Sequence, residues 1–256
     1  PNPNYGIGDL LACLEDDKDV ERFPLGVREA VRRRLKAVER FSIFSETGTD
    51  VRDLFKAGRI TVLLLRDLDH QVRGLVIGLL VKKIMKLRGI TNECEKRLEM
   101  NPNEEDATKL KDAIEKGLPR GWILIDEAHN YIPQTGIIGS KASLKKYVNE
   151  GRNIGLSIAV TTQQPSGLDA AIRRNADILI IHSITMKGDL EVTEGMLNTE
   201  VPDVVDIAHV RFTSRVFEHM VRELQVGYAI VSCPNANRIF LSKMRPRVTA
   251  HGGREY

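Results

Sequence analysis

The chain has 256 residues, of which 42% are hydrophobic and 29% charged, and its formal net charge is +3. It is long enough for one large domain or two small ones, and its composition is that of a soluble globular protein. The small positive charge permits a nucleic-acid partner without arguing for one, and no apolar run approaches the roughly 20 residues that cross a bilayer, so we expect no membrane partner.

The N-terminal residues, PNPNYGIGDL, have neither the basic start nor the apolar core of an export signal, which indicates a cytoplasmic protein. They also lack an initiator methionine, so we expect the chain to be a fragment of a longer protein. Cys13, Cys94 and Cys233 are odd in number and match no metal-ligand spacing, and we interpret them as reduced thiols.

The first predicted segment, residues 1–57, is helical, because apolar residues recur at helical spacing over most of residues 9–57. It contains the densest basic cluster of the chain, VRRRLKAVER, at residues 31–40. We favour the solvated face of a surface helix for this cluster over a contact with DNA.

A short apolar run rich in β-branched residues predicts a strand over Ile60–Leu65. A helix is expected over residues 70–89, and the cations near its end, which include Arg88, suit the negative end of the helix dipole without any bound phosphate. Residues 92–117 are polar and charged, which predicts an exposed and partly helical insertion.

The rest of the chain alternates between apolar runs and helical patterns. The expected elements are strand 121–126, helix 144–153, strand 156–162, a turn and helix over 163–177, strand 177–184, helices over 188–197 and around Phe217, and strands 227–233 and 238–244. We expect the last two strands to pair antiparallel through a turn at residues 234–237.

Strands that alternate with helices and are apolar throughout predict an α/β fold with a parallel sheet covered on both faces. Ligands of such sheets bind at the carboxyl ends of the strands. The acids and amides that fall at such ends are Asp67, Asp69, Asp126, Glu127, Gln163 and Gln164. We therefore expect residues that are distant in sequence to meet at one edge of the sheet.

Asp126 closes the strand WILID, and Glu127 follows it directly. In phosphoryl-transfer enzymes, an acid at this position holds the Mg²⁺ that binds the nucleotide's phosphates. A neighbouring carboxylate can act as general base on the attacking water. The alternative is that Asp126 caps a helix and Glu127 is solvated. His129 has no second histidine at helical spacing, so we interpret it as a hydrogen-bonding partner rather than a metal ligand.

Gln163 follows the next strand, where its amide can sense a γ-phosphate or hold the attacking water. The same residues also form a turn, since Pro165 follows, and the two interpretations are compatible. Arg152 can stabilise charge on a transferring phosphoryl group, in cis or from a neighbouring subunit, or can simply complement a helix dipole. No GxxxxGK[ST] phosphate-binding loop occurs in the chain, and FSETGTDV lacks the lysine that such a loop needs.

Three blocks of sequence carry a resemblance: WILIDEAHNYIP, the stretch from LKKYVNEGRNIG through TTQQPSGLDAAIRRNADILIIH, and the closing GYAIVS with KMRPRVTAHGG. Together they resemble the C-terminal part of the ATPase core of HerA-type proteins, the HerA/FtsK group of hexameric DNA translocases, over about residues 50–253. DEAH-box helicases share only the four letters DEAH. The resemblance implies that residues 58–256 are the C-terminal portion of a RecA-like P-loop NTPase core and that residues 1–57 are a helical insertion.

The resemblance implies Asp126 as the Walker B acid associated with Mg²⁺, Glu127 as catalytic base, Gln163 as γ-phosphate sensor and Arg152 as an arginine finger that reaches a neighbouring protomer. ATP and Mg²⁺ are the implied cofactors. Intact relatives carry a phosphate-binding loop and a β-barrel domain ahead of this region, so we expect this chain alone to lack ATPase activity. Such relatives pump double-stranded DNA through a homo-hexamer and act with a NurA-type nuclease in DNA-end processing and repair.

DNA contacts are expected from Lys141, Lys145 and Lys146, which can bind phosphates without reading sequence, although a solvated surface loop explains them equally well. The leading prediction is thus part of an ATP-driven DNA translocase or helicase. The alternatives are the ATPase of a secretion or conjugation system, and a non-catalytic interaction module that retains the fold.

Overall fold

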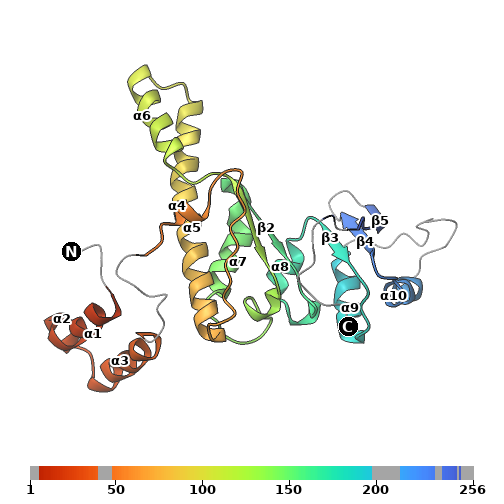
Figure 1. Cartoon of the computed structure of the whole chain (residues 1–256), viewed down its shortest axis with the longest axis horizontal. Helices are drawn as coiled ribbons and strands as arrows, with labels where there is room; N and C mark the ends of the chain where they lie inside the picture. Colours follow the sequence, from red (N-terminus) through yellow and green to blue (C-terminus); the bar gives the residue numbers. More distant parts are fainter. Residues whose placement is uncertain (1–5, 40–47, 198–213, 234–237, 247, 249–256) are drawn as a thin grey trace. The chain divides into compact units, whose positions relative to one another are not determined.

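The computed structural model describes residues 6–39, 48–197, 214–233, 238–246 and 248 (Figure 1). The chain divides into two compact units. The first unit comprises Pro1–Trp122, Ile138–Ser143 and Gly151–Leu156, and the second comprises Ile123–Ile137, Leu144–Glu150 and Ser157–Tyr256. Within the described ranges no helix is both long enough and apolar enough to span a bilayer.

The first unit begins with short helices. They are α1 (Ile7–Asp16), α2 (Lys18–Glu21), α3 (Leu25–Glu39) and α4 (Val51–Leu54). The helical prediction for this segment is confirmed for its described residues. No residue of α3 is buried, and its Arg32 forms an ion pair with Glu15 of α1. The described part of the basic cluster is therefore exposed or half-buried, which both interpretations of the cluster allow.

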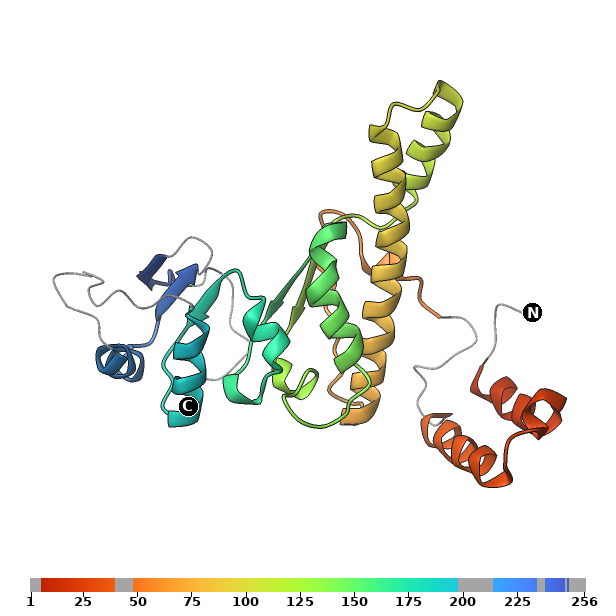
Figure 2. The ribbon, with the colours of Figure 1, turned by 180° about the vertical axis from the view of Figure 1, so that it is seen from behind.

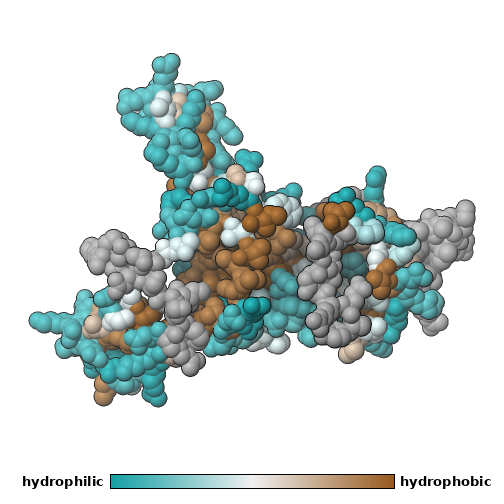
Figure 3. All heavy atoms as spheres, in the orientation of Figure 1, coloured by the Kyte–Doolittle hydropathy of each residue, from teal (hydrophilic) through white to brown (hydrophobic). Residues whose placement is uncertain are grey.

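The strand predicted over Ile60–Leu65 does not form, and this prediction is wrong. The segment pairs with no strand in the part of the chain that the structure describes, and Ile60, Val62 and Leu64 are 94%, 73% and 76% exposed. An apolar run becomes a strand only where a neighbour pairs with its backbone groups, and the described residues offer none. Hydrophobic residues, coloured brown in Figure 3, gather on the face of the molecule that it shows.

Helix α5 (His70–Glu99) runs well past the expected end at residue 89 and forms a hairpin with α6 (Glu104–Glu115), as both ribbon views show (Figures 1 and 2). Side chains cap both helices: Asp69 accepts from the backbone N–H of Val72, and Asn103 from that of Asp106. The predicted insertion at residues 92–117 is thus helical at both ends, with exposed helix faces.

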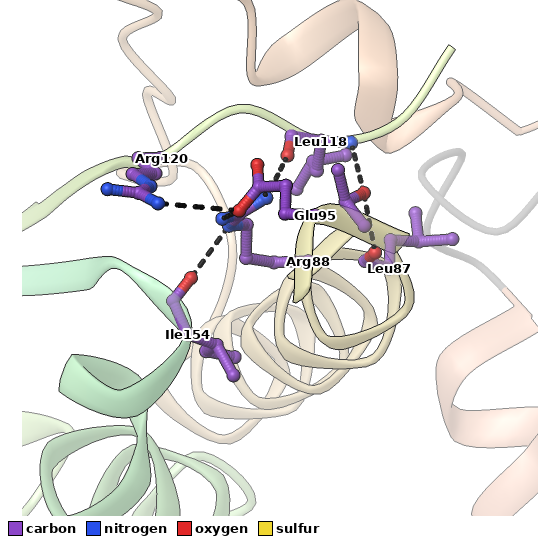
Figure 4. Close-up of polar contacts among 7 residues, drawn as sticks. Leu87, Arg88, Glu95, Leu118, Arg120 and Ile154 are labelled. Atoms are coloured by element: carbon purple, nitrogen blue, oxygen red, sulfur yellow. Dashed lines mark hydrogen bonds and ion pairs between the residues drawn. The ribbon is translucent and has the colours of Figure 1, made fainter. Parts of the chain in front are cut away.

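Arg88 corrects the interpretation of the cations in α5. Its side chain is fully buried in the middle of the helix, not solvated near its end. The guanidinium donates to both carboxylate oxygens of Glu95 (Nη1–Oε1 2.9 Å, Nη2–Oε2 2.5 Å). It also donates to the backbone carbonyls of Ile154 (2.7 Å) and Leu118 (3.2 Å) (Figure 4). Hydrogen bonding from Arg88 lowers the pKa of Glu95, which keeps the pair ionised.

The carbonyls that Arg88 binds lie just ahead of a parallel strand pair, β1 (Gly121–Ile125) and β2 (Leu156–Val160), which α7 (Lys141–Glu150) connects. The N–H of Gly121 donates to Gly155 at the start of the pair, and that of Thr161 to Ile125 at its end. This pattern confirms the α/β class and the parallel arrangement predicted for these two strands.

A second sheet has the order β3–β4–β5, with β3 (Leu179–Ile181), β4 (Tyr228–Cys233) and β5 (Arg238–Lys243). The predicted antiparallel pairing of the last two strands is confirmed, while its turn at residues 234–237 lies outside the described residues. The expectation of a parallel strand over 177–184 is wrong, because β3 pairs antiparallel with β4.

The reason for this pairing is the core of the second unit. Ile181 of β3 lies opposite Ile230 of β4, and both are buried with residues from α9 (Lys187–Met196) and α10 (Ser214–Arg222). The buried cluster comprises Ile181, Leu190, Leu197, Phe217, Val221 and Ile230. An apolar strand packs equally well in either direction, so the pattern of β3 does not encode the antiparallel choice.

We predict that Arg88→Met destabilises the protein by about 3 kcal/mol, because a partly buried carboxylate and two backbone carbonyls lose their donor. The matched control is Lys109→Met. Lys109 pairs with Glu105 at 2.6 Å on the exposed face of α6, so its loss should cost about 0–1 kcal/mol. Urea unfolding followed by circular dichroism measures both, and equal losses would contradict the anchoring role of Arg88.

Candidate functional site

The ends of β1 and β2 bring together three of the predicted site residues. Asp126 and Glu127 follow β1, and Gln163 lies three residues beyond β2. Two backbone hydrogen bonds join these segments, Thr161 N–H to the Ile125 carbonyl at 3.0 Å and Ala128 N–H to the Thr161 carbonyl at 2.9 Å. The expected meeting of acids and amide at one sheet edge is therefore present in the structure.

Asp126 is exposed and held at one of its two carboxylate oxygens. The hydroxyl of Thr161 and the backbone N–H of Glu127 (3.0 Å) both donate to Oδ1. These bonds orient the carboxylate through Oδ1. Sequence reasoning missed Thr161, although a hydroxyl residue directly after the second strand, beside the first strand's acid, was a signal for it.

Glu127 has a left-handed backbone, with φ of 49° and ψ of 48°. Only one other non-glycine residue of the described chain, Asn101, has a positive φ. This conformation costs roughly 1–2 kcal/mol for a residue with a β-carbon. The turn directs the carboxylate toward the end of β2, where Nε2 of Gln163 donates to Oε1 at 2.8 Å.

His129 lies in the 3₁₀ turn η1 (Ala128–Asn130), on the other side of the Glu127 carboxylate. Its Nδ1 is 2.9 Å from the hydroxyl oxygen of Thr162 and 3.4 Å from Oε2 of Glu127. The predicted hydrogen-bonding role of His129 is confirmed. Across the described residues, no group of three or more His, Cys, Asp or Glu side chains could hold a metal ion.

The turn interpretation of the QQPS sequence is also confirmed. Pro165 opens the 3₁₀ turn η3 (Pro165–Gly167), and α8 (Ala170–Arg174) follows with Asp169 as its side-chain cap. The N–H of Ser166 donates to buried Asp189 of α9 at 2.9 Å. Turn and amide thus coexist, because the turn uses backbone groups and leaves the side chain of Gln163 at the strand end.

The other predicted residues lie elsewhere. Arg152 is an exposed residue of η2 (Gly151–Ile154), which belongs to the first unit, whereas the cluster described above belongs to the second. Asp67 and Asp69, expected at the end of a strand, follow a segment that forms none. Asp69 instead caps α5.

The three candidate DNA-binding lysines are on α7. Lys145 pairs with nearly buried Asp169 at 3.4 Å, and Lys146 pairs with exposed Glu150 at 3.6 Å. Lys141 is the first residue of the helix. Each ammonium group has three N–H donors, so a nucleic-acid phosphate would share Lys145 and Lys146 with these carboxylates or compete for them.

No protein-family model matches the chain. Over 150 residues it is 24% identical to the DNA double-strand break repair helicase HerA of Pyrococcus furiosus. The chain is similar to HerA. This similarity confirms the resemblance that the motifs indicated, and it covers 56% of the chain and 27% of HerA. The chain thus spans about a quarter of the length of this curated relative.

Solved structures of the genome packaging NTPase B204 from Sulfolobus turreted icosahedral virus 2 are also similar. The complex with ATP-gammaS has a TM-score of 0.45 at 15% identity and covers 78% of this chain and 74% of B204. The complex with AMPPCP has a TM-score of 0.40 at 16% identity, with coverages of 55% and 63%.

The left-handed backbone of Glu127 predicts that glycine is more stable than alanine at this position, the reverse of their usual order in a helix. Glu127→Gly should be more stable than Glu127→Ala by about 1 kcal/mol, because both remove the carboxylate but only glycine adopts a positive φ without strain. Lys111 in exposed helix α6 is the control, where Gly should be about 1 kcal/mol less stable than Ala. Urea unfolding of the four variants measures this, and the same order at both sites would contradict a left-handed Glu127.

Proposed function

We propose that this chain is part of the motor core of an ATP-driven DNA translocase or helicase of the HerA type, with a RecA-like P-loop NTPase fold. The observation that carries this proposal is the pair of acids after β1, Asp126 and Glu127, with Gln163 from the end of β2 bonded to Glu127 at 2.8 Å. Acids and a polar sensor on adjacent parallel strands are the protein side of a phosphoryl-transfer site. The similarity to HerA supports the same assignment.

Asp126 is the residue that would hold Mg²⁺, through a water molecule. Its chemistry fits, because Mg²⁺ prefers carboxylate oxygens and keeps several waters, and this carboxylate belongs to an exposed residue whose Oδ1 accepts from Thr161 and Glu127. The ion, when bound with ATP, neutralises charge on the phosphates. The contribution of the protein is to fix the direction of this carboxylate before any ligand arrives.

Glu127 acts as the general base that orients the attacking water, and Gln163 as the γ-phosphate sensor. The amide of Gln163 has two N–H donors, of which one is directed at Glu127. It can therefore contact a phosphate oxygen and the base together. This arrangement couples the presence of the γ-phosphate to the position of the carboxylate that accepts a proton from the attacking water.

Arg152 acts as an arginine finger in a neighbouring protomer's site, within a cytoplasmic homo-hexamer. Its exposure on η2 supports this role, since a finger that works in trans has to project from its own subunit. Double-stranded DNA is the proposed polymer, contacted by Lys141, Lys145 and Lys146, and a NurA-type nuclease is the proposed partner in DNA-end processing and repair.

The proposal predicts that the gene encodes a GKS or GKT phosphate-binding loop upstream of Pro1 and that its full-length product hydrolyses ATP. In that protein, Glu127→Gln should abolish hydrolysis and leave nucleotide binding largely intact, because the amide cannot accept a proton from water. Steady-state turnover and calorimetric ATP binding measure the two effects.

Glu150→Gln is the matched control for this experiment. Glu150 is an exposed acid at the end of α7 that pairs with Lys146, so its neutralisation should leave turnover unchanged. A native gene without a phosphate-binding loop would refute the ATPase assignment. Undiminished hydrolysis by the Glu127→Gln protein would remove Glu127 as the base.

The trans-acting role of Arg152 makes a separate prediction. Hexamers of Arg152→Ala subunits should be inactive, and so should hexamers of Glu127→Gln subunits. Mixed hexamers should recover part of the activity, because some sites then combine an intact Glu127 with an intact Arg152 from the neighbour. Turnover measured across mixing ratios checks this, and a series that never exceeds either parent would argue against an arginine finger in trans.

A further inference from the structure

His129 stands between two acceptors that the sequence separates widely. Its Nδ1 contacts the hydroxyl oxygen of Thr162, after β2, and the carboxylate of Glu127, after β1, at 2.9 and 3.4 Å. These are the polar partners of its side chain in the described part of the chain, and the side chain is only 16% exposed. Within the described residues, the Nδ1 atom of this largely buried imidazole thus contacts only residues that follow the two strands.

The two contacts favour one of the two neutral tautomers of His129. An ionised carboxylate only accepts hydrogen bonds, so a lone pair on Nδ1 facing Oε2 of Glu127 would be repelled. The tautomer with the hydrogen on Nδ1 avoids this repulsion, and its N–H donates to the Thr162 oxygen at 2.9 Å, with Oε2 of Glu127 at 3.4 Å. The Thr162 oxygen also accepts a hydrogen bond from the backbone N–H of Gln164 at 3.0 Å. This bond fixes the position of the hydroxyl group that contacts the His129 ring.

Both oxygens of Glu127 thus have a neighbour: Nε2 of Gln163 donates to Oε1 at 2.8 Å, and Nδ1 of His129 lies 3.4 Å from Oε2. The left-handed backbone of Glu127 sets the direction in which its side chain leaves the main chain, and the two contacts orient its carboxylate. A general base works only if its carboxylate is oriented toward the water before reaction. Two side chains from the two strand ends supply that orientation here.

We infer that His129 is a positioning residue for Glu127, and that Thr162 fixes the ring in the tautomer and direction this requires. The inference rests on the proposed function, in which Glu127 is the base. His129 touches neither nucleotide nor water in this role. It acts through the Glu127 carboxylate, and Thr162 acts through His129.

The first experiment needs no nucleotide. Long-range ¹H–¹⁵N correlation spectra of the ¹⁵N-histidine-labelled chain report which ring nitrogen carries the hydrogen. We expect a hydrogen on Nδ1 of His129, assigned with His129→Asn, and a change in its Nδ1 resonance in Thr162→Val but not in Thr162→Ser. A neutral ring protonated only on Nε2 would overturn the inference whatever the chain's activity.

The second experiment measures ATP turnover by the full-length gene product. His129→Leu and Thr162→Val should each lower kcat about 10-fold or more with KM nearly unchanged, which is typical for residues that orient a working side chain. His129→Asn keeps a donor at the Nδ1 position, and Thr162→Ser keeps the hydroxyl. Both should retain activity within about twofold of the unmodified protein, a rescue that a merely space-filling role would not give.

The double variant distinguishes a shared positioning role from two separate effects of the substitutions on kcat. His129→Leu with Thr162→Val should be no slower than His129→Leu alone, because Thr162 acts only through the ring, whereas independent effects would multiply. Urea midpoints identify any variant that fails to fold, and Thr162→Val carries the test if His129→Leu does. Unchanged kcat in both single variants overturns the positioning role, while an active Glu127→Gln protein would instead overturn the proposed function itself.

Discussion

A single buried guanidinium fixes where the two parallel strands begin. Arg88 is fully buried, and a charge in that position is tolerated only when its donors are satisfied, which Glu95 and the carbonyls of Leu118 and Ile154 achieve. The carbonyl of Leu118 lies three residues before β1, and that of Ile154 lies two residues before β2. Each strand then runs for five residues, so the starting points set by Arg88 also set where the strands end. The polar residues of the candidate site come directly after those ends.

The sequence predicted this strand pair and its polar ends but gave the wrong role to Arg88. The reason is that four cations close to an expected helix end look like solvated charges. The contrary signal was spacing: residues 81, 84, 88 and 91 share one helix face, and Val81, Ile84 and Thr91 are buried beside Arg88. Glu95 continues that face seven residues after Arg88. An arginine and an acid on an otherwise buried stripe predict a buried pair.

Two strand predictions failed for a different reason. The runs at Ile60–Leu65 and in β3 both have the residue types of a buried strand, and local propensity is all that such a pattern encodes. Whether a strand forms depends on a neighbour that can pair with it, and its direction depends on which apolar face must be covered. β3 meets both requirements through Ile230 of β4, whereas Ile60–Leu65 lies exposed without a described partner.

The backbone at Glu127 shows why the candidate site could be predicted only in part. Sequence located the acids, but it contains no sign that this glutamate adopts a left-handed conformation, for which glycine or asparagine is the usual choice. Retaining a glutamate there costs stability that local structure does not return. Its carboxylate accepts a hydrogen bond from Gln163 and lies beside His129. Gln163 follows β2, whereas His129 follows β1. A strained residue whose carboxylate has a partner at each oxygen indicates that the position of the carboxylate, rather than the turn, is what this part of the fold maintains.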